Sequence, residues 1–453
     1  MINMVNSSSN VQVKEAVFIT PSDPTPSHVL KLSAIDSQLF LRFTIEYLLI
    51  YRLGRASDQR AIVARVKDAL ARALVPYYPL AGRVRARADG SCLEVVCRGQ
   101  GAVFVESSGE YSVADFEKAP RYVSEWRNLL ALEVTDVVKG APLLVMQLTW
   151  LSDGSAALSV GFSHCICDGI GSVEFLKYFS QLAVACQYDA TAEIKPKPKP
   201  KPKPKPVWDR YLLDPTPCTL QTSHHPEFTR VTDLSNFSTR FNPDQLTPTA
   251  TTFHEWRVNE LKTLVASTSQ LSISSLTTFD VVSAHIWRSW ARALNFPPQQ
   301  TLKLLFSINI RNRVKPSLPN GYYGNAIVLG CALTTARQLT ENGLSYATEL
   351  IIEAKNQVDD NFVREVVDSV SLSSTRASQV PDSVGVLILS QWSKLGLENV
   401  DFGLGRPVQV CPVCTDKYCI LVPVQDHSRS IKSMLAVPTE AVGRYEQQIK
   451  ALE

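Results

Sequence analysis

Apolar residues recur with a helical period early in the chain and form strand-like runs later in the same half. Within residues 61–74, Val63, Val66 and Leu70 recur every three or four positions, which predicts an amphipathic helix. The following segment, residues 75–84, contains two prolines and predicts a turn that leads into a strand. We therefore expect a helix followed by a strand in this part of the chain.

Two mainly apolar, strand-like runs, residues 142–151 and 156–163, predict neighbouring strands. Asp153 and Gly154 lie between them, and an Asp-Gly pair favours the left-handed backbone of a tight hairpin turn. After a glycine-rich stretch, residues 173–186 return to helical spacing. The pattern thus predicts a strand, a short glycine-rich turn and a helix in succession.

The second half of the chain mixes the same kinds of element. Residues 274–294 have the pattern of a capped amphipathic helix, residues 302–313 that of a strand, and residues 315–330 that of a turn before another strand. Such irregular alternation favours an α/β or mixed α+β fold over a barrel or an all-helical bundle. With 453 residues, 45% of them hydrophobic, the chain is long enough for two similar-sized domains with separate cores.

The clearest boundary is a tract of alternating lysine and proline at residues 195–206. Every second residue of the tract lacks an amide donor, so we expect an exposed polyproline II crossover, at ~3.1 Å per residue about 37 Å long. The predicted domains are therefore residues 1–194 and 207–453. Without the six lysines of the tract the net charge of +3 becomes −3, which argues against a nucleic-acid surface.

Targeting signals, membrane spans and metal sites are not indicated. The chain does not open on a basic segment followed by a long apolar run, and no stretch reaches the roughly 20 apolar residues of a membrane span. We expect a soluble, cytoplasmic monomer with reduced thiols, because ten cysteines are too sparse for a disulfide scaffold. Cys411, Cys414 and Cys419 lie close in sequence, but a zinc site needs a fourth ligand that the local sequence does not offer.

The candidate chemistry lies in residues 159–176, SVGFSHCICDGIGSVEFL, at the predicted junction of strand and helix. His164 and Asp168 are four positions apart, and the glycines beside them allow a tight turn from which side chains can project into a cleft. An isolated HxxxD pattern is also compatible with a buried histidine and a capping aspartate. Cys165 and Cys167 flank the histidine, and in a strand-to-turn segment we expect them to be packing residues and not nucleophiles.

A second glycine-spaced turn, DFGLG at residues 401–405, changes the interpretation when it is taken together with HCICDG. With HxxxD near its middle and this motif near its end, the sequence resembles the plant acyl-CoA-dependent acyltransferases of the BAHD family. The resemblance covers nearly the whole chain. Supporting matches are KLSAID at 31–36, YYPLAGRV at 77–84, NIRNRVKPSLPNGYYGN at 309–325 and KPKPVWDRYLLDP around the crossover.

The resemblance implies two chloramphenicol-acetyltransferase-like domains with a channel between them, acyl-CoA as co-substrate, a small-molecule alcohol as acceptor and no permanently bound cofactor. It also implies that His164 is the catalytic base. Transfer of an acyl group from a thioester to an alcohol requires the hydroxyl proton to leave as the oxygen attacks, and a neutral imidazole with a pKa of about 6.5 can accept it. Family members act in a ternary complex, so no serine or cysteine nucleophile is required.

The two aspartates of the motifs have structural roles in the family. By resemblance, Asp168 points away from the histidine and pairs with an arginine, for which Arg311 and Arg313 are the candidates. Asp401 anchors its own turn by hydrogen bonds. The remaining residues assigned to the two motifs are Gly169, Phe402, Gly403 and Gly405.

Three positions depart from the family pattern. Leu404 replaces a tryptophan, which removes an indole N–H donor from a position that we assign to the acceptor pocket. Asn309 replaces the aspartate of a DxR motif, so one carboxylate of that network is absent. Ser163 stands where the related peptide-condensing domains prefer a second histidine, which disfavours a condensation activity.

Further substrate-contacting residues can be assigned by resemblance and local context. Ser274, Ser275 and Thr277 are candidates for contacts to the pantetheine or phosphates of CoA, with simple helix capping as the alternative. Asp36 and Glu46 are assigned to the acceptor pocket. Glu46 would favour a cationic alcohol such as an alkaloid, unless it lies on a solvated strand face.

The sequence therefore predicts an acyl-CoA-dependent O-acyltransferase of plant specialised metabolism. The residues around HCICDGIGS and the crossover resemble those of family members that transfer a benzoyl or hydroxycinnamoyl group to an aliphatic or alkaloid alcohol, and so favour that reaction. Acetyl transfer to a terpenoid or simple alcohol is the alternative within the class. A catalytically silent metabolite-binding relative is the alternative outside it; His164 argues against that alternative, whereas Leu404 and Asn309 leave room for it.

Overall fold

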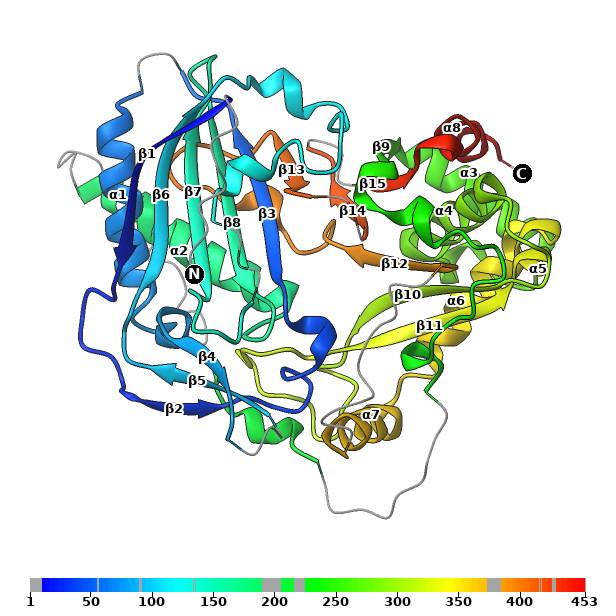
Figure 1. Cartoon of the computed structure of the whole chain (residues 1–453), viewed down its shortest axis with the longest axis horizontal. Coiled ribbons are helices and arrows are strands. Elements are labelled where there is room, and N and C mark those ends of the chain that lie inside the picture. Colours follow the sequence, from blue (N-terminus) through cyan, green and yellow to red (C-terminus); the bar gives the residue numbers. More distant parts are fainter. Residues whose placement is uncertain are drawn as a thin grey trace.

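The computed structural model contains two six-stranded sheets, a small three-stranded sheet and the helices that pack against them (Figure 1). This arrangement confirms the prediction of a mixed α and β fold. Within the described residues, no helix combines the length and the apolar character needed to cross a bilayer. The structure describes residues 10–54, 57–88, 92–132, 134, 136–189, 205–215, 225–372, 384–414, 416, 418–425 and 429–452.

The first sheet is built mainly from the N-terminal half of the chain. Strands β7 and β8 form the antiparallel hairpin that the sequence predicts, with Leu144 opposite Phe162. β3 runs antiparallel along the other edge of β8, with Thr44 opposite Ser163. In order across the sheet, the strands are β1 (Val11–Ile19), β6 (Ala102–Gly109), β7 (Leu144–Trp150), β8 (Ala156–Ser163), β3 (Thr44–Tyr51) and β13 (Gln409–Pro412).

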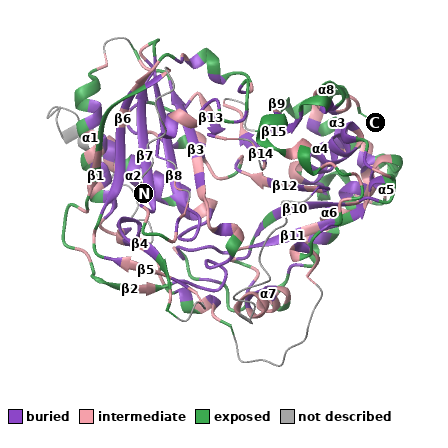
Figure 2. Ribbon diagram, viewed as in Figure 1, coloured by how far each residue is buried: buried purple, intermediate pink, exposed green. Residues whose placement is uncertain are grey.

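Strand β8 is buried on both faces (Figure 2). Phe162 packs against Phe175 of α2 (Gly169–Asp189), whereas the next position, Gly161, faces the turn η4 (Arg127–Leu130). Because successive residues of a strand point to opposite faces, α2 and η4 cover opposite sides of the sheet. Helix α1 (Gln59–Ala73) packs beside α2 and turns its predicted apolar stripe to the core.

The second sheet is built from the C-terminal half. Its most buried helix, α4, is enclosed on nearly all sides because it packs against α3, α6 and α8. In order, the strands are β11 (Ile327–Thr335), β10 (Thr301–Asn309), β12 (Val386–Gln391), β14 (Cys419–Pro423), β15 (Ile431–Pro438) and β9 (Leu246–Phe253). The helices are α3 (Glu255–Thr268), α4 (Thr278–Leu294), α5 (Ala336–Glu341), α6 (Leu344–Asn356), α7 (Asp360–Leu372) and α8 (Val442–Lys450).

The C-terminal half contributes one strand to the first sheet, across the predicted boundary at residues 195–206. β13 comes from the C-terminal half but pairs with β3 of the first sheet, with Cys411 opposite Leu48. Apart from Lys205 and Pro206, the lysine-proline tract lies outside the described residues. The small third sheet contains β2 (His28–Lys31), β5 (Leu93–Cys97) and β4 (Arg83–Ala86).

The connection between β10 and β11 carries the C-terminal half to the end of β8. This connection, residues 310–326, extends from the second sheet toward the first half of the molecule (Figure 1). Val207, just after the crossover tract, forms an isolated β-bridge with Tyr322 of the connection. The HxxxD segment therefore lies where three distant parts of the sequence meet.

Candidate active site

His164 directly follows β8, at the strand end that the sequence predicts. Its backbone N–H donates to the carbonyl of Phe43 at 2.8 Å, which ties the residue to the start of β3. The side chain is only 9% exposed. Burial lowers the pKa of His164 below its ordinary value, so the ring is neutral near pH 7.

Asn325 fixes the protonation pattern of the His164 ring. The Nδ2 group of Asn325 donates to the His164 carbonyl at 2.6 Å and to Asp36 Oδ1 at 2.9 Å. Its Oδ1 therefore faces His164 Nδ1, at 2.9 Å. Because an amide oxygen can only accept, we assign the ring proton to Nδ1, which leaves Nε2 with its lone pair. The site thus holds a neutral imidazole in the tautomer that a base at Nε2 requires.

The thiols beside the histidine lack the properties of nucleophiles. Cys165 and Cys167 are both buried, and burial raises the pKa of each to about 12. Cys165 Sγ donates to the carbonyl of Leu41. Since the thiolate is the reactive form of cysteine, both side chains are packing residues, as expected from the sequence.

Asp168 stabilises the turn after His164. Its carboxylate receives two hydrogen bonds from Arg311, at 2.7 and 3.1 Å, and one each from the backbone N–H groups of Gly171 and Ala326. Burial alone would raise the pKa of Asp168, but Arg311 and the backbone donors bring it below its usual range. Arg313, the other candidate, instead donates to backbone carbonyls at the end of α6.

Asp401 holds the DFGLG turn together. Its Oδ1 accepts from the backbone N–H groups of Gly403, Leu404 and Gly405 at 2.7–3.1 Å. Gly403 and Gly405 have φ of 77° and 83°, in the left-handed region that glycine adopts readily. Phe402 is fully buried and packs edge-on against an aromatic ring of α2. The DFGLG motif is thus a closed turn held by hydrogen bonds to its own aspartate.

Leu404, assigned from the sequence to the acceptor pocket, lies in a turn near the end of β3 that is farther from His164. The DFGLG turn lies beside Tyr51, whose hydroxyl donates to the chain just before the turn. Tyr51 is seven residues along β3 from Thr44, the residue paired with the neighbour of His164. At ~3.3 Å per residue, about 23 Å separates these two ends of the strand. Leu404 is 5% exposed and belongs to the first core, so its replacement of tryptophan is a packing change.

Asp36 and Glu46 are also engaged elsewhere. Asp36 is 0% exposed and pairs with Arg210 at 3.2 Å, behind Asn325, so it supports the site instead of lining a pocket. Glu46 Oε2 accepts from Arg127 Nη1 at 2.5 Å. Because Arg127 compensates its charge, the basis for expecting a cationic acceptor is removed.

Two aromatic side chains that sequence reasoning missed form a wall beside His164. The ring of Phe43 lies 5.1 Å from the imidazole, and Tyr418 stacks on Phe43 with centroids 5.7 Å apart. Both side chains are partly buried. Phe43 precedes β3 and Tyr418 precedes β14, so the wall combines the two halves of the chain, and no local pattern indicates it.

A cleft of about 740 Å³ opens on the second half, between α3, the start of α4 and the loops after β12 and β14. Thr278, in the first turn of α4, is among its lining residues, so the positive end of a helix dipole faces the cleft. The charged side chains around it are Lys262, Lys394, Arg406, Arg429, Glu255 and Glu398. Arg429 pairs with Glu255, which leaves an excess of positive charge suited to an anionic ligand.

Packed side chains link this cleft to the HxxxD segment. Ser393 lines the cleft, and its neighbour Trp392 packs edge-on against Tyr47 of β3 with centroids 4.8 Å apart. The Tyr47 hydroxyl in turn bonds to Ser172, in the first turn of α2, at 2.7 Å. Trp392 and Tyr47 therefore connect the cleft wall at Ser393 to the start of α2, just after the HxxxD turn.

The serines and threonine assigned to CoA lie beside the cleft but do not line it. Thr277 caps α4: its hydroxyl accepts from the N–H of Asp280, and the Asp280 carboxylate accepts from the N–H of Thr277. The capping alternative therefore describes Thr277. Ser274 and Ser275 are exposed in the short turn before it, and Thr278 is the helix residue that faces the cleft.

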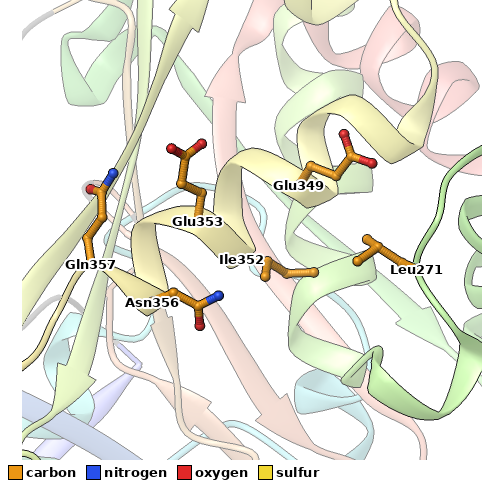
Figure 3. Close-up of a pocket in the computed structure, with 6 residues that line it drawn as sticks. All are labelled: Leu271, Glu349, Ile352, Glu353, Asn356 and Gln357. Carbon is orange, nitrogen blue, oxygen red and sulfur yellow. The ribbon is translucent and has the colours of Figure 1, made fainter.

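A second pocket, of about 460 Å³, lies on α6 (Figure 3). Glu349 and Glu353 line it, so its charge disfavours phosphate groups. Within the part of the chain that the structure describes, no three His, Cys, Asp or Glu side chains come together in a group that could hold a metal ion.

Comparisons with known proteins identify the family. The profile described as the Transferase family matches residues 9–452. Omega-hydroxypalmitate O-feruloyl transferase of Arabidopsis thaliana is 28% identical over 97% of this chain and 92% of its own length. Taxadien-5-alpha-ol O-acetyltransferase of Taxus chinensis is 30% identical over 98% of this chain and 97% of its own length.

Solved structures share the fold. Vinorine synthase superposes with a TM-score of 0.70 at 20% identity, covering 96% of each chain. TRI101 of F. sporotrichioides, solved with coenzyme A and T-2, gives 0.71 at 17% identity, covering 93% of this chain and 97% of its own. With a family profile over nearly the whole chain and plant acyltransferases among its relatives, this chain belongs to the Transferase family of BAHD acyltransferases and is an acyltransferase.

Proposed function

We propose that the chain transfers an acyl group from acyl-CoA to the hydroxyl group of a small molecule, with His164 as the general base. The observation that carries the proposal is the contact of His164 Nδ1 with Asn325 Oδ1 at 2.9 Å. This contact leaves the Nε2 lone pair available to accept a proton from an alcohol. The lowered pKa of His164 supports the same role, because the base is then unprotonated near pH 7.

The reaction needs one proton acceptor. Nε2 of His164 takes the hydroxyl proton as the alcohol oxygen bonds to the thioester carbonyl carbon, which gives a tetrahedral intermediate. When the carbonyl re-forms, the C–S bond breaks and the CoA sulfur receives the proton from Nε2. The products are an ester and free CoA thiol, without a covalent enzyme intermediate. The raised pKa values of Cys165 and Cys167 are consistent with this direct route.

The pH dependence follows from the lowered pKa of His164. Activity requires the neutral ring, so kcat/KM should be constant near pH 7 and fall as the pH drops through the pKa of the buried histidine. We expect the midpoint of this acid limb below the ordinary value of about 6.5. Initial rates between pH 4.5 and 8 measure it, with folding checked at each pH by circular dichroism. A midpoint above 6.5 would contradict the proposed environment of the base.

We propose that the nucleotide of CoA occupies the basic cleft. The cationic side chains Lys262, Lys394 and Arg406 and the start of α4 suit the phosphates, because helix N-termini and basic groups both attract anions. From there the pantetheine arm would pass Ser393 and Trp392 toward His164. The name of one relative, fatty alcohol:caffeoyl-CoA acyltransferase of Arabidopsis thaliana, supports a CoA donor.

Charge reversal in the cleft should weaken CoA binding without affecting the chemical step. In Lys394→Glu or Arg406→Glu we expect the KM for acyl-CoA to rise about 10-fold or more, as loss of a charge-assisted hydrogen bond implies, with kcat changed less. Lys139→Glu, an exposed lysine outside the cleft, is the matched control. Equal KM values in all three variants would exclude the cleft as the nucleotide site.

We further propose an aromatic acyl donor. The stacked pair Phe43 and Tyr418, beside His164, offers flat apolar surface to a benzoyl or hydroxycinnamoyl ring. The relatives include both a feruloyl and an acetyl transferase, so their names alone do not choose between these donors. For the acceptor we propose a neutral hydroxyl compound, because Arg127 compensates the charge of Glu46.

A donor panel tests the proposal. Purified protein is mixed with acetyl-, benzoyl- or coumaroyl-CoA and a set of alcohols, and the ester products are identified by mass. We expect ester formation with a higher kcat/KM for the aromatic donors. A higher kcat/KM for acetyl-CoA would contradict the aromatic donor and indicate an acetyltransferase. If no donor reacts while the folded protein binds CoA, the chain is a silent binding relative.

A further inference from the structure

A buried ion pair lies behind Asn325, on the side away from His164. Nη1 of Arg210, in the turn η5 (Arg210–Leu213), lies 3.3 and 3.2 Å from the two carboxylate oxygens of Asp36. Both side chains are almost completely buried, with 3% and 0% exposure. Arg210 Nη2 also donates to the carbonyl of Ile166, in the loop between the two motif residues. The pair therefore touches the catalytic segment from the far side.

The carboxylate of Asp36 determines how Asn325 is oriented. Asp36 Oδ1 accepts from both the backbone N–H and the Nδ2 group of Asn325, each at 2.9 Å. A rotation of the amide by half a turn would face its oxygen toward the carboxylate and its N–H₂ group toward His164. That arrangement loses a charge-assisted hydrogen bond and opposes two acceptors. The His164 carbonyl, which also accepts from Nδ2 at 2.6 Å, opposes the same rotation. The negative charge of Asp36 and this carbonyl thus together select the orientation in which Asn325 Oδ1 accepts from His164 Nδ1.

Arg210 makes this buried negative charge tolerable. An uncompensated buried carboxylate is strongly destabilising or becomes protonated, and Arg210 is the cation that pairs with Asp36. The position of the Arg210 side chain requires glycine at residue 324, because an added Cβ there would lie 1.6 Å from Arg210 Nη1. Backbone hydrogen bonds at Val207 fix the segment that carries Arg210. The Val207 N–H donates to the Gly321 carbonyl, and the Val207 carbonyl accepts from the Tyr323 N–H.

We infer that Arg210 and Asp36 are positioning residues that hold His164 in its Nδ1–H tautomer through Asn325. The segment that follows the crossover tract is then part of the catalytic apparatus, although it does not contact the imidazole. This inference rests on the proposed role of His164 as base. Its structural content, the tautomer of the ring, can be measured without any substrate.

The test is the tautomer of His164 in the full chain. Two-bond ¹H–¹⁵N spectra of protein labelled with ¹⁵N-histidine distinguish Nδ1–H from Nε2–H rings, and the His164 signals among the seven histidines are those missing in His164→Gln. We expect Nδ1–H in the wild type. In Asp36→Asn the residue at 36 can donate as well as accept, so only the His164 carbonyl still opposes rotation of Asn325 and a fraction of the Nε2–H form should appear. kcat should fall about 10- to 100-fold, with the KM for acyl-CoA changed less than twofold.

Three further variants separate positioning from general destabilisation. Gly324→Ala displaces the Arg210 side chain and should give the same mixture of tautomers as Asp36→Asn. Arg210→Lys keeps the positive charge, so its fraction of the Nδ1–H form should be higher than in Gly324→Ala. Glu227→Gln, a buried carboxylate bonded to His225 in the second half, is the matched control and should leave the His164 signals unchanged. If Asp36→Asn does not fold, Arg210→Lys and Gly324→Ala carry the test.

The inference is overturned if folded variants at Asp36, Arg210 and Gly324 all keep a pure Nδ1–H signal. A mixed tautomer in protein that transfers no acyl group would support the positioning role and count against the proposed function instead. The positioning role is therefore tested by the tautomer of His164, and the proposed function by acyl transfer.

Discussion

Replacement of His164 by alanine is expected to lower kcat by about 10²- to 10⁴-fold, the usual contribution of a positioned general base. The loss follows because Nε2 of His164 is the atom proposed to take the hydroxyl proton. Affinity for CoA should be retained, since His164 does not line the basic cleft. Release of CoA thiol measures kcat, and titration calorimetry measures CoA affinity. Wild-type kcat in this variant would exclude His164 as the base.

The neighbouring cysteine supplies the control. Cys167→Ala removes a buried thiol whose pKa is raised to about 12, so it should keep kcat within a few-fold of the wild type. If Cys167→Ala instead abolished turnover while His164→Ala retained it, a thiol nucleophile would have to replace the direct mechanism.

Replacement of Asp168 by alanine is expected to lower the free energy of unfolding by about 3–5 kcal/mol. The change leaves the guanidinium of Arg311 without its carboxylate and removes the acceptor of the N–H groups of Gly171 and Ala326. Activity should fall with the folded fraction. Urea unfolding measures the change in stability.

Two further variants identify the cause of that loss. The double variant Asp168→Leu/Arg311→Met should be more stable than Asp168→Ala, because it removes both charges of the buried pair. Glu341→Ala breaks an exposed ion pair with Arg337 and should cost less than about 1 kcal/mol. Asp168→Ala protein with wild-type stability and no activity would contradict the structural role and point to a part in the chemistry.

The HxxxD segment could be predicted from sequence because its determinants are local. The two apolar runs, the turn at Asp153 and Gly154, and the helical spacing after Asp168 lie within about forty residues. They lead directly to His164 at a strand end and to Asp168 at the start of a helix. The second motif could be predicted for the same reason, since among the described residues Asp401 accepts hydrogen bonds only from its own turn.

The support of the catalytic base could not be predicted in this way. Asn325 is 161 residues from His164 and 289 from Asp36, and Arg210 is 174 residues from Asp36. Contacts over such separations leave no periodic pattern. Asp36, Arg210 and Asn325 each lie in a segment that matches the family, but nothing within those segments shows that the three side chains meet.

The surroundings of the residues assigned to substrate contacts could not be predicted for a related reason. Leu404 follows a turn that packs against the end of β3 farthest from His164, and Glu46 has a partner, Arg127, on another element. A position within a motif does not reveal how far a strand carries it from the reaction centre, or which charge will oppose it.

The most direct test of the account is the release of CoA thiol by the wild-type chain with and without an alcohol acceptor. Direct transfer in a ternary complex predicts thiol release only when the acceptor is present, with one ester molecule formed for each thiol. Equal release without the acceptor would mean that the chain hydrolyses the thioester or acylates itself, and would contradict the role proposed for His164.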